Sequence, residues 1–367
     1  MDDRVREHAE TLVDWSARIS ESDDVVLSVS EDAHELGVAV AEALGERGAN
    51  VHTTYGSAEV SRAYLRAHDG DFDENPEFER ALYAHADAVL RLGGGRNTAA
   101  NADVDSDTRQ AYSKARDGIR EARMDTDWVS TVHPTRSLAQ QAGMSYEAYQ
   151  DFVYAAVNRD WQELADEQAK LKDLLDAGEE VRIVSEETDL TMRIDDRVAV
   201  NSCASVAYDS HNLPSGEVFT APYATEGEVL FDVPMTINGK RVRDVHLSFE
   251  DGDVVEYSAA QNEDVIREVV ETDEGARRLG ELGIGMNRGI DRVTDSILFD
   301  EKMGGTVHLA LGRAYTSNFP EDREDDANDS AVHVDLITDL RTGGRLDIDG
   351  ETVQKDGVFR WEDGFGG

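Results

Sequence analysis

The spacing of hydrophobic residues changes once along the chain, close to residue 180. Before that point, short apolar runs alternate with segments that carry apolar residues at helical spacing. Strands are therefore expected at residues 23–30, 49–55, 88–94 and 127–134, and helices between them at 31–48, 58–68, 78–87 and 107–123. Strands that alternate with helices are typical of a parallel sheet with helices on both faces. The first part of the chain is therefore predicted to be an α/β domain.

The pattern after residue 180 is typical of antiparallel strands. Residues 135–180 read as helices that link two domains, and Ser145 is a candidate N-cap there. From Val181 onward, apolar and polar residues alternate between turns rich in Gly and Asp, and one helix is expected at about 262–280. We therefore predict an α/β domain with a helical linker over residues 1–178, and a β-rich α+β domain over 179–367.

The amino-acid composition gives the chain a strong negative charge. The chain has 78 Asp and Glu against 36 Lys and Arg, a net charge of −42, although 40% of its residues are hydrophobic. The acidic residues are spread over periodic segments, so we expect a folded protein with an acidic shell that high salt screens. This composition favours the cytoplasm of a halophile, and it disfavours nucleic acid or an anionic membrane as a partner.

Other sequence features restrict the class of protein further. An apolar run long enough to cross a membrane is lacking, and the first residues do not resemble a signal peptide. Cys203 is the only cysteine, which excludes an internal disulfide and a zinc site made of thiolates, and we expect it to pack in a core. The glycine-rich segment 92–101 lacks the spacing of a phosphate-binding loop and is interpreted as a turn after a strand.

Two histidines in expected strands are the first candidates for chemistry. His308 lies in TVHLALG and His333 in AVHVDLI, where His333 and Asp335 are two residues apart. Strand side chains repeat every two residues, so His333 and Asp335 project from one face and can form half of a site for a divalent metal. By itself, however, the spacing favours an ordinary polar outer face.

Three further residues stand in unusual settings. Glu217 opens a strand after the stiff turn LPSG, and Glu281 follows the expected helix 262–280, where the helix dipole opposes a carboxylate and indicates another partner such as a cation. Tyr315 follows His308 by seven residues. Each also has a simple structural interpretation, as a turn, a surface or a rim residue. Together with the histidines they supply the inventory of a two-metal hydrolase, with zinc, cobalt or manganese as candidate ions.

These same residues lie in stretches that resemble the metallo-aminopeptidases of the aminopeptidase T and aminopeptidase S type. The similar stretches are LPSGEVFTAP, TDEGARRLGELGIGMN, ILFDEKMGGTVHLALGRAY and NDSAVHVDL, in the family's order. The segment 133–157 resembles the family's linker, and the first 130 residues resemble it in pattern. The tract 316–329, TSNFPEDREDDAND, and Val334 depart from the family.

The resemblance implies a two-domain fold, a homodimer and removal of N-terminal residues from peptides. It implies that residues 179–367 form the metal-binding catalytic domain, that two divalent ions activate a water, and that Tyr315 is catalytic. The implied metal ligands are Glu217, Glu281, His308, His333 and Asp335.

Two other functions use a similar set of residues. A two-metal phosphoesterase would add a basic clamp, for which Arg288, Arg292 and Arg313 are the nearest candidates. A non-enzymatic metal-binding protein would bind many cations weakly on its acidic shell.

Overall fold

The computed structural model describes residues 1–237 and 239–366, and these form two compact units. The first unit comprises Met1–Arg159 and Ala204–Pro214, and the second comprises Asp160–Cys203 and the chain from Ser215 onward. The second unit begins ahead of the helix over residues 161–177, whereas the sequence pattern placed the division after it.

The first unit contains a parallel sheet of strand order β2-β1-β3-β4-β8. The central strands β1 and β3 are buried apolar runs, as expected for parallel strands that are covered on both faces. The strands are β1 (Asp24–Ser30), β2 (Asn50–Gly56), β3 (Ala88–Gly93), β4 (Asp127–Val132) and β8 (Asn212–Leu213).

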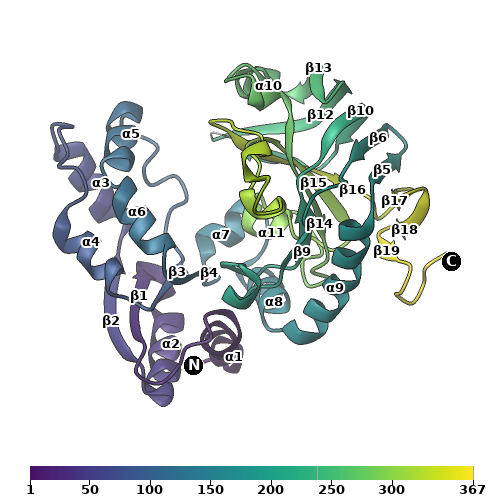
Figure 1. Cartoon of the computed structure of the whole chain (residues 1–367). Helices are drawn as coiled ribbons and strands as arrows, with labels where there is room; N and C mark the ends of the chain where they lie inside the picture. The colour runs from purple at the N-terminus through teal and green to yellow at the C-terminus, as the bar shows by residue number, and fades with distance from the viewer. Residues whose placement is uncertain (238, 367) are drawn as a thin grey trace. The chain divides into compact units, whose positions relative to one another are not determined.

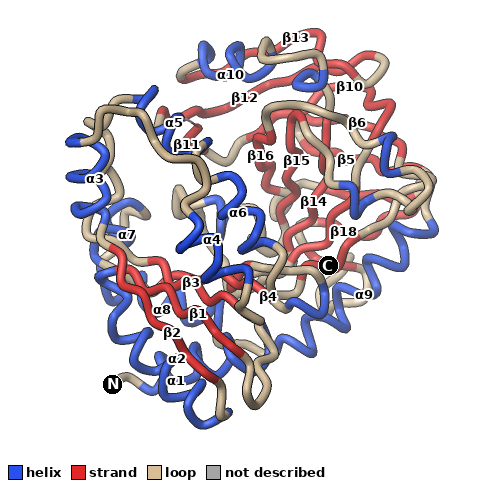
Figure 2. The backbone as a smooth tube through the Cα atoms, turned by 60° about the vertical axis from the view of Figure 1, so that its left-hand side comes forward, coloured by secondary structure: helices blue, strands red, loops and turns tan. Residues whose placement is uncertain are grey.

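Helices flank this sheet on both sides, with α1 and α2 on one side and α4 and α6 on the other (Figure 2). The helix expected over 107–123 is in fact two helices, because the chain leaves helical geometry at Arg116. Ser145 caps the helix that follows it by accepting a hydrogen bond from the Ala148 backbone N–H. The helices are α1 (Asp3–Glu10), α2 (His34–Arg47), α3 (Ala58–Ala67), α4 (Glu77–Ala84), α5 (Ser106–Lys114), α6 (Asp117–Met124), α7 (Arg136–Gln141) and α8 (Tyr146–Val157).

The second unit contains a large sheet of strand order β11-β12-β10-β6-β5-β17-β18-β19, with β13 paired to β12. Its strands pair in the antiparallel sense, as the alternation of apolar and polar residues predicted. They are β5 (Glu180–Ser185), β6 (Thr188–Arg193), β10 (Tyr223–Phe231), β11 (Met235–Ile237), β12 (Lys240–Glu250), β13 (Asp253–Gln261), β17 (Arg345–Ile348), β18 (Glu351–Lys355) and β19 (Val358–Phe359).

A smaller antiparallel sheet, which we call the central sheet, has the order β16-β15-β14-β9-β7. Figure 1 shows β14, β15 and β16 side by side, with α9 (Trp161–Ala177) alongside the β9 end. Every residue of β14 and β15 is buried. The strands are β7 (Val200–Ser202), β9 (Glu217–Thr220), β14 (Leu279–Gly285), β15 (Thr306–Gly312) and β16 (His333–Asp339).

These sheets confirm an α/β unit with a parallel sheet and a β-rich unit, but the helix predicted over 262–280 is wrong. Helix α10 (Glu263–Val270) is much shorter, and a single helical turn at Gly275–Arg277 leads into β14. A further short helix, α11, spans Ile297–Asp300. Cys203 is buried, as predicted. Within the part of the chain that the structure describes, none of the helices combines the length and hydrophobicity needed to cross a membrane.

His8 is a fully buried histidine in the first unit. Its Nε2 lies 2.7 Å from the Thr131 hydroxyl, while its Nδ1 has no hydrogen-bond partner among the described residues. Burial, reinforced by the nearby His133, lowers the pKa of His8 to about 3. Its ordinary pKa is 6.5, so between these values the unfolded chain binds a proton that the folded protein does not.

The free energy of unfolding should therefore fall as the pH drops from about 6.5 towards 3, by about 1.4 kcal/mol per pH unit from His8 alone. His8→Gln keeps a neutral partner for Thr131 and should reduce this slope, whereas His52→Gln, on an exposed strand, should not. Unfolding curves at pH 7 and pH 5 measure the difference between each variant and the wild type. Equal slopes for all three proteins would contradict the assignment.

Candidate metal centre

Four of the predicted ligands project from one face of the central sheet. On antiparallel strands, residues directly opposite each other share a face. Glu281 of β14 lies opposite Ala310 of β15, which lies opposite Asp335 of β16. His308 and His333 stand two residues before Ala310 and Asp335 on the same strands, so they share that face. The register of three strands thus brings together residues that are up to 54 positions apart in the sequence.

Glu217 reaches the same face at the start of β9. It lies opposite Gly285, which is four residues beyond Glu281 on β14. The turn before it requires a glycine, because Gly216 has φ +117° and a Cβ there would lie 2.8 Å from the Asn287 Cβ. The rigid turn that the sequence indicated therefore directs the Glu217 side chain into the buried sheet.

A second glycine makes room for His308. Gly283 lies opposite His308 on β14, and a Cβ at position 283 would lie 2.0 Å from the imidazole ring. The ring of His308 therefore occupies the space above the glycine, and its side chain is 1% exposed. A glycine inside a buried strand usually indicates such a close approach.

The side chains form two groups that share Glu281. In the first group, His308 Nε2 lies 3.0 Å from Glu281 Oε1 and 3.7 Å from Glu217 Oε2. In the second, His333 Nε2 lies 3.4 Å from Glu281 Oε2 and 3.6 Å from Asp335 Oδ1. In each group, three ligand atoms lie within 4.8 Å of one another, so each can surround one ion. The two oxygens of Glu281 face different groups, which is the geometry of a bridging carboxylate.

Both imidazoles are oriented by backbone carbonyls. His308 Nδ1 lies 3.0 Å from the Glu301 carbonyl oxygen, and His333 Nδ1 lies 2.8 Å from the Arg313 carbonyl oxygen. Each carbonyl thus accepts from Nδ1–H and leaves Nε2 as the nitrogen that faces the carboxylates. Nε2 can donate a proton to them, or bind a cation once that proton is lost.

The electrostatics of the cluster favour bound positive charge. Burial alone would raise the pKa of Glu281, but hydrogen bonds to His308 and His333 outweigh it and lower the pKa to about 2. Burial alone would lower the pKa of His333, but its contacts with Asp335 and Glu281 raise the pKa to about 10. Glu281 thus stays ionised, and the negative charge that favours protons on the imidazoles would also favour a bound cation.

One buried oxygen tests whether a metal fits. Glu217 Oε2 is inaccessible to solvent and has no hydrogen-bond partner among the described residues. An ionised oxygen in that state is costly unless a cation binds it. Three carboxylates, those of Glu217, Glu281 and Asp335, contact the two imidazoles of this site. Imidazole nitrogens and carboxylate oxygens suit zinc, cobalt or manganese, so the residues fit divalent ions.

The sequence analysis missed Lys302, which is also part of this site. Its side chain is 1% exposed, its Nζ lies 3.6 Å from Glu217 Oε1, and it forms an ion pair with Glu301. A fixed cation beside Glu217 holds that carboxylate and offsets part of its charge. Lys302 lies in the segment FDEKMGG before β15, and no periodicity in that segment marks the lysine as functional.

Tyr315 lies at the open side of the cluster, just beyond the end of β15. Its ring centroid is 5.0 Å from that of His333 and 5.8 Å from that of Phe219, and its side chain is 44% exposed. Partial burial, followed by the negative charges of Glu281 and Asp335, raises the pKa of Tyr315. Its hydroxyl therefore stays protonated at neutral pH and can donate a hydrogen bond.

The structure brings all six predicted residues together, but the reasoning for Glu281 was wrong. Glu281 lies inside the buried strand β14 and not at the C-terminus of a helix. The free-energy cost of a carboxylate at this position therefore comes from burial, and a helix dipole plays no part.

A buried group of carboxylates and imidazoles on a rigid antiparallel sheet, with a protonated tyrosine beside it, defines a metal-dependent hydrolase. The sequence profile of the thermophilic metalloprotease family M29 matches residues 1–364 of this chain. The chain belongs to this family.

Several known proteins are similar to part or nearly all of this chain. Aminopeptidase 2 of Geobacillus stearothermophilus is 36% identical over a stretch that covers 41% of this chain and 39% of that protein. Aminopeptidase AmpS of Bacillus subtilis is 26% identical and covers 97% of both chains. The solved structure of wild-type AmpT from Thermus thermophilus superposes with a TM-score of 0.85 at 23% identity, over 98% of this chain and 99% of that one, which shows a shared fold.

The contact between Gly283 and His308 gives a test of the site without changing a ligand. Gly283→Ala places a methyl group where the imidazole lies, so it should displace His308, cost about 1–3 kcal/mol of stability and weaken metal binding. Gly45→Ala is the control, because position 45 lies in α2 with open space around it. Thermal unfolding and metal analysis after dialysis measure both effects. Normal metal content in Gly283→Ala would contradict this account of the site.

Proposed function

We propose that this protein removes N-terminal residues from peptides, using water activated at a centre of two divalent metal ions. It is a metallo-aminopeptidase: it belongs to a metalloprotease family, and relatives that match nearly its whole length are aminopeptidases. The observation that carries the two-metal proposal is Glu281, whose two oxygens face two separate groups of ligands.

The proposed ligand set follows from this arrangement. One ion would be held by Glu217, His308 and Oε1 of Glu281, and the other by His333, Asp335 and Oε2 of Glu281. Glu281 would therefore be the bridging carboxylate. Zinc, cobalt and manganese all suit this donor set.

The ions, when bound, would polarise the scissile carbonyl and lower the pKa of a water molecule. The protein's own groups hold the charges in place for this chemistry. Lys302 fixes Glu217, and the carbonyl oxygens of Glu301 and Arg313 fix the two imidazoles. Because these partners are already in position, little reorganisation is needed when substrate binds.

Tyr315 would donate a hydrogen bond to the oxyanion that forms at the substrate carbonyl. Three observations support this role: its ring lies beside His333, its side chain is partly exposed, and its raised pKa keeps the hydroxyl protonated. The basic candidates for a phosphoesterase do not support that alternative, because Arg288 pairs with Glu362, Arg292 pairs with Asp291, and Arg313 is exposed.

The setting of the enzyme is also part of the proposal. The net charge of −42 supports the cytoplasm of a salt-accumulating organism, and retention of the fold in dilute buffer would contradict that setting. The resemblance to the aminopeptidase T and S type supports a homodimer. Peptides are the proposed substrates, and nucleic acid and membranes are not proposed partners.

Metal stoichiometry distinguishes a bridging carboxylate from a ligand of one ion. Dialysed wild type should retain about two ions per chain. Glu281→Gln should lose both ions, whereas Asp335→Asn should lose one. Asp339→Asn is the matched control, since Asp339 lies on the same strand but pairs with Arg341. One tight ion retained in Glu281→Gln with unchanged affinity would remove the bridging role.

Replacing Tyr315 should lower turnover without changing metal binding. Tyr315→Phe should lower kcat for an aminoacyl-nitroanilide by roughly 100- to 1,000-fold, because an oxyanion donor is lost, while metal content stays unchanged. Tyr257→Phe, on β13 of the large sheet, should leave both unchanged. Near-normal turnover in Tyr315→Phe would contradict the role, and cleavage of nitrophenyl phosphate in place of the nitroanilide would contradict the aminopeptidase proposal.

A further inference from the structure

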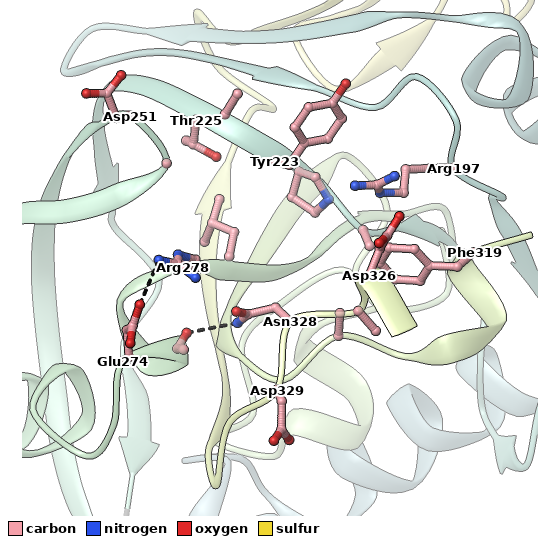
Figure 3. Close-up of a pocket in the computed structure, with 18 residues that line it drawn as sticks. Arg197, Tyr223, Thr225, Asp251, Glu274, Arg278, Phe319, Asp326, Asn328 and Asp329 are labelled. Atoms are coloured by element: carbon pink, nitrogen blue, oxygen red, sulfur yellow. Dashed lines mark hydrogen bonds and ion pairs between the residues drawn. The ribbon is translucent and has the colours of Figure 1, made fainter. Parts of the chain in front are cut away.

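A cavity of about 560 Å³ opens in the second unit beside the turn that carries Tyr315 (Figure 3). Its walls come from the end of β9, the start of β10, the segment 274–279 that leads into β14, and residues of 314–329. Most charged residues of the tract 316–329 are exposed. Phe319, however, is buried and lines the cavity.

Arg197 extends into this cavity between two aromatic rings. Its guanidinium carbon lies 4.6 Å from the ring centroid of Tyr223 and 4.6 Å from that of Phe319. Tyr223 is fixed in turn, because its hydroxyl donates to Asp195 over 2.6 Å. Figure 3 shows the guanidinium between the two rings. The arginine is therefore held in one place by its faces, which leaves its N–H edge for hydrogen bonds.

That edge lacks an anionic partner. Arg197 Nη1 donates to the Asp196 carbonyl oxygen at 3.2 Å, but Nε is buried and has no hydrogen-bond partner among the described residues. Among the described residues, this guanidinium forms no ion pair with a carboxylate, although the protein contains 78 acidic residues. Burial, and then the charge of Arg323, lowers the pKa of Arg197, so an anion bound there would offset a real cost.

The other charged groups near the cavity are either satisfied or turned away. Asp326 pairs with Arg323, and Glu274 pairs with Arg278. Asp329 is exposed and points away from Arg197 in Figure 3, and Asp251 lies at the opposite end. Of the two arginines in the cavity wall, Arg278 forms ion pairs, whereas Arg197 forms none with the described residues.

Asn318 links the residue after Arg197 to β9, the strand that also carries Glu217. Its side-chain NH2 group donates to the carbonyl oxygens of Val198 and Phe219, at 3.0 and 3.3 Å, and its backbone carbonyl accepts from the Val198 N–H. Phe219 contacts Tyr315, and Ala314, which precedes Tyr315, lines the cavity. Ala314, in the cavity wall, is therefore adjacent in sequence to the residue proposed to contact the substrate carbonyl.

We propose that this cavity is a substrate subsite in which Arg197 binds a carboxylate of the peptide on the far side of the scissile bond. The inference rests on the proposed aminopeptidase function. An extended tripeptide spans about 10 Å, so a peptide whose first residue lies at the ligands of the metal centre can extend past Tyr315 into the cavity. The carboxylate is either the C-terminus of a short peptide or an acidic side chain.

Steady-state kinetics with paired peptides test the subsite. Wild type should show a lower KM for Leu-Ala-Ala than for its C-terminal amide if the terminal carboxylate binds. It should show a lower KM for Leu-Ala-Glu-amide than for Leu-Ala-Gln-amide if an acidic side chain binds. Arg197→Gln should raise KM for the preferred acid by about 10- to 100-fold, the range of a hydrogen bond to a charged group, and leave KM for the neutral peptides and kcat unchanged.

Two further variants separate recognition from loss of structure. Arg197→Lys keeps the charge without the planar fork and should restore part of the preference. Arg182→Gln, which breaks an exposed ion pair with Asp189 on the large sheet, should have no effect. Equal KM values for acid and neutral peptides in wild type, or a parallel loss for both in Arg197→Gln, would overturn the subsite. If wild type cleaves none of the four peptides, the aminopeptidase function itself fails.

Discussion

The structure depends on three carboxylates that lie together on one sheet face: Glu217 and Glu281, which are buried, and Asp335, which is partly buried. Buried carboxylates repel each other and lose hydration, so such a group persists only where positive charge compensates it. Two imidazoles and the Lys302 ammonium supply part of that charge within the chain. The carbonyl oxygens that hold the imidazoles also belong to this arrangement. The rest of the second unit is the frame that prevents these charges from separating.

That frame is unusually inflexible for a functional site. Glu217, Glu281 and His308 lie within strands that pair with a neighbour on each side, and β14 and β15 are buried throughout, whereas β16 with His333 and Asp335 is the edge strand. Loops carry many functional residues because they vary easily, whereas a strand fixes the side chain through its register. A shift of one residue between β14 and β15 would turn every ligand of one strand to the opposite face. The positions of the ligands are therefore set by the register of the paired strands.

Much of this could be predicted from the sequence, because the signals were local. The alternating pattern placed His333 and Asp335 on one strand face, and the stiff turn indicated the position of Glu217. Glu281 was misread because glycines usually end helices, whereas here Gly283 lies inside a strand beneath a ring. Register and the positions of Lys302, Asn318 and Arg197 depend on contacts between distant segments. No period in the chain carries that information, and the family resemblance supplied only the ligands.

The contact between Gly283 and His308 has a consequence for how this sequence can change over time. Position 283 tolerates only a hydrogen atom while residue 308 is a histidine, because the ring fills the volume of any larger side chain. The two positions are therefore epistatic: a larger residue at 283 becomes acceptable only after the ligand at 308 has been lost. Selection that keeps the imidazole at position 308 therefore also keeps the glycine at position 283, although a glycine has no side chain that could bind a metal.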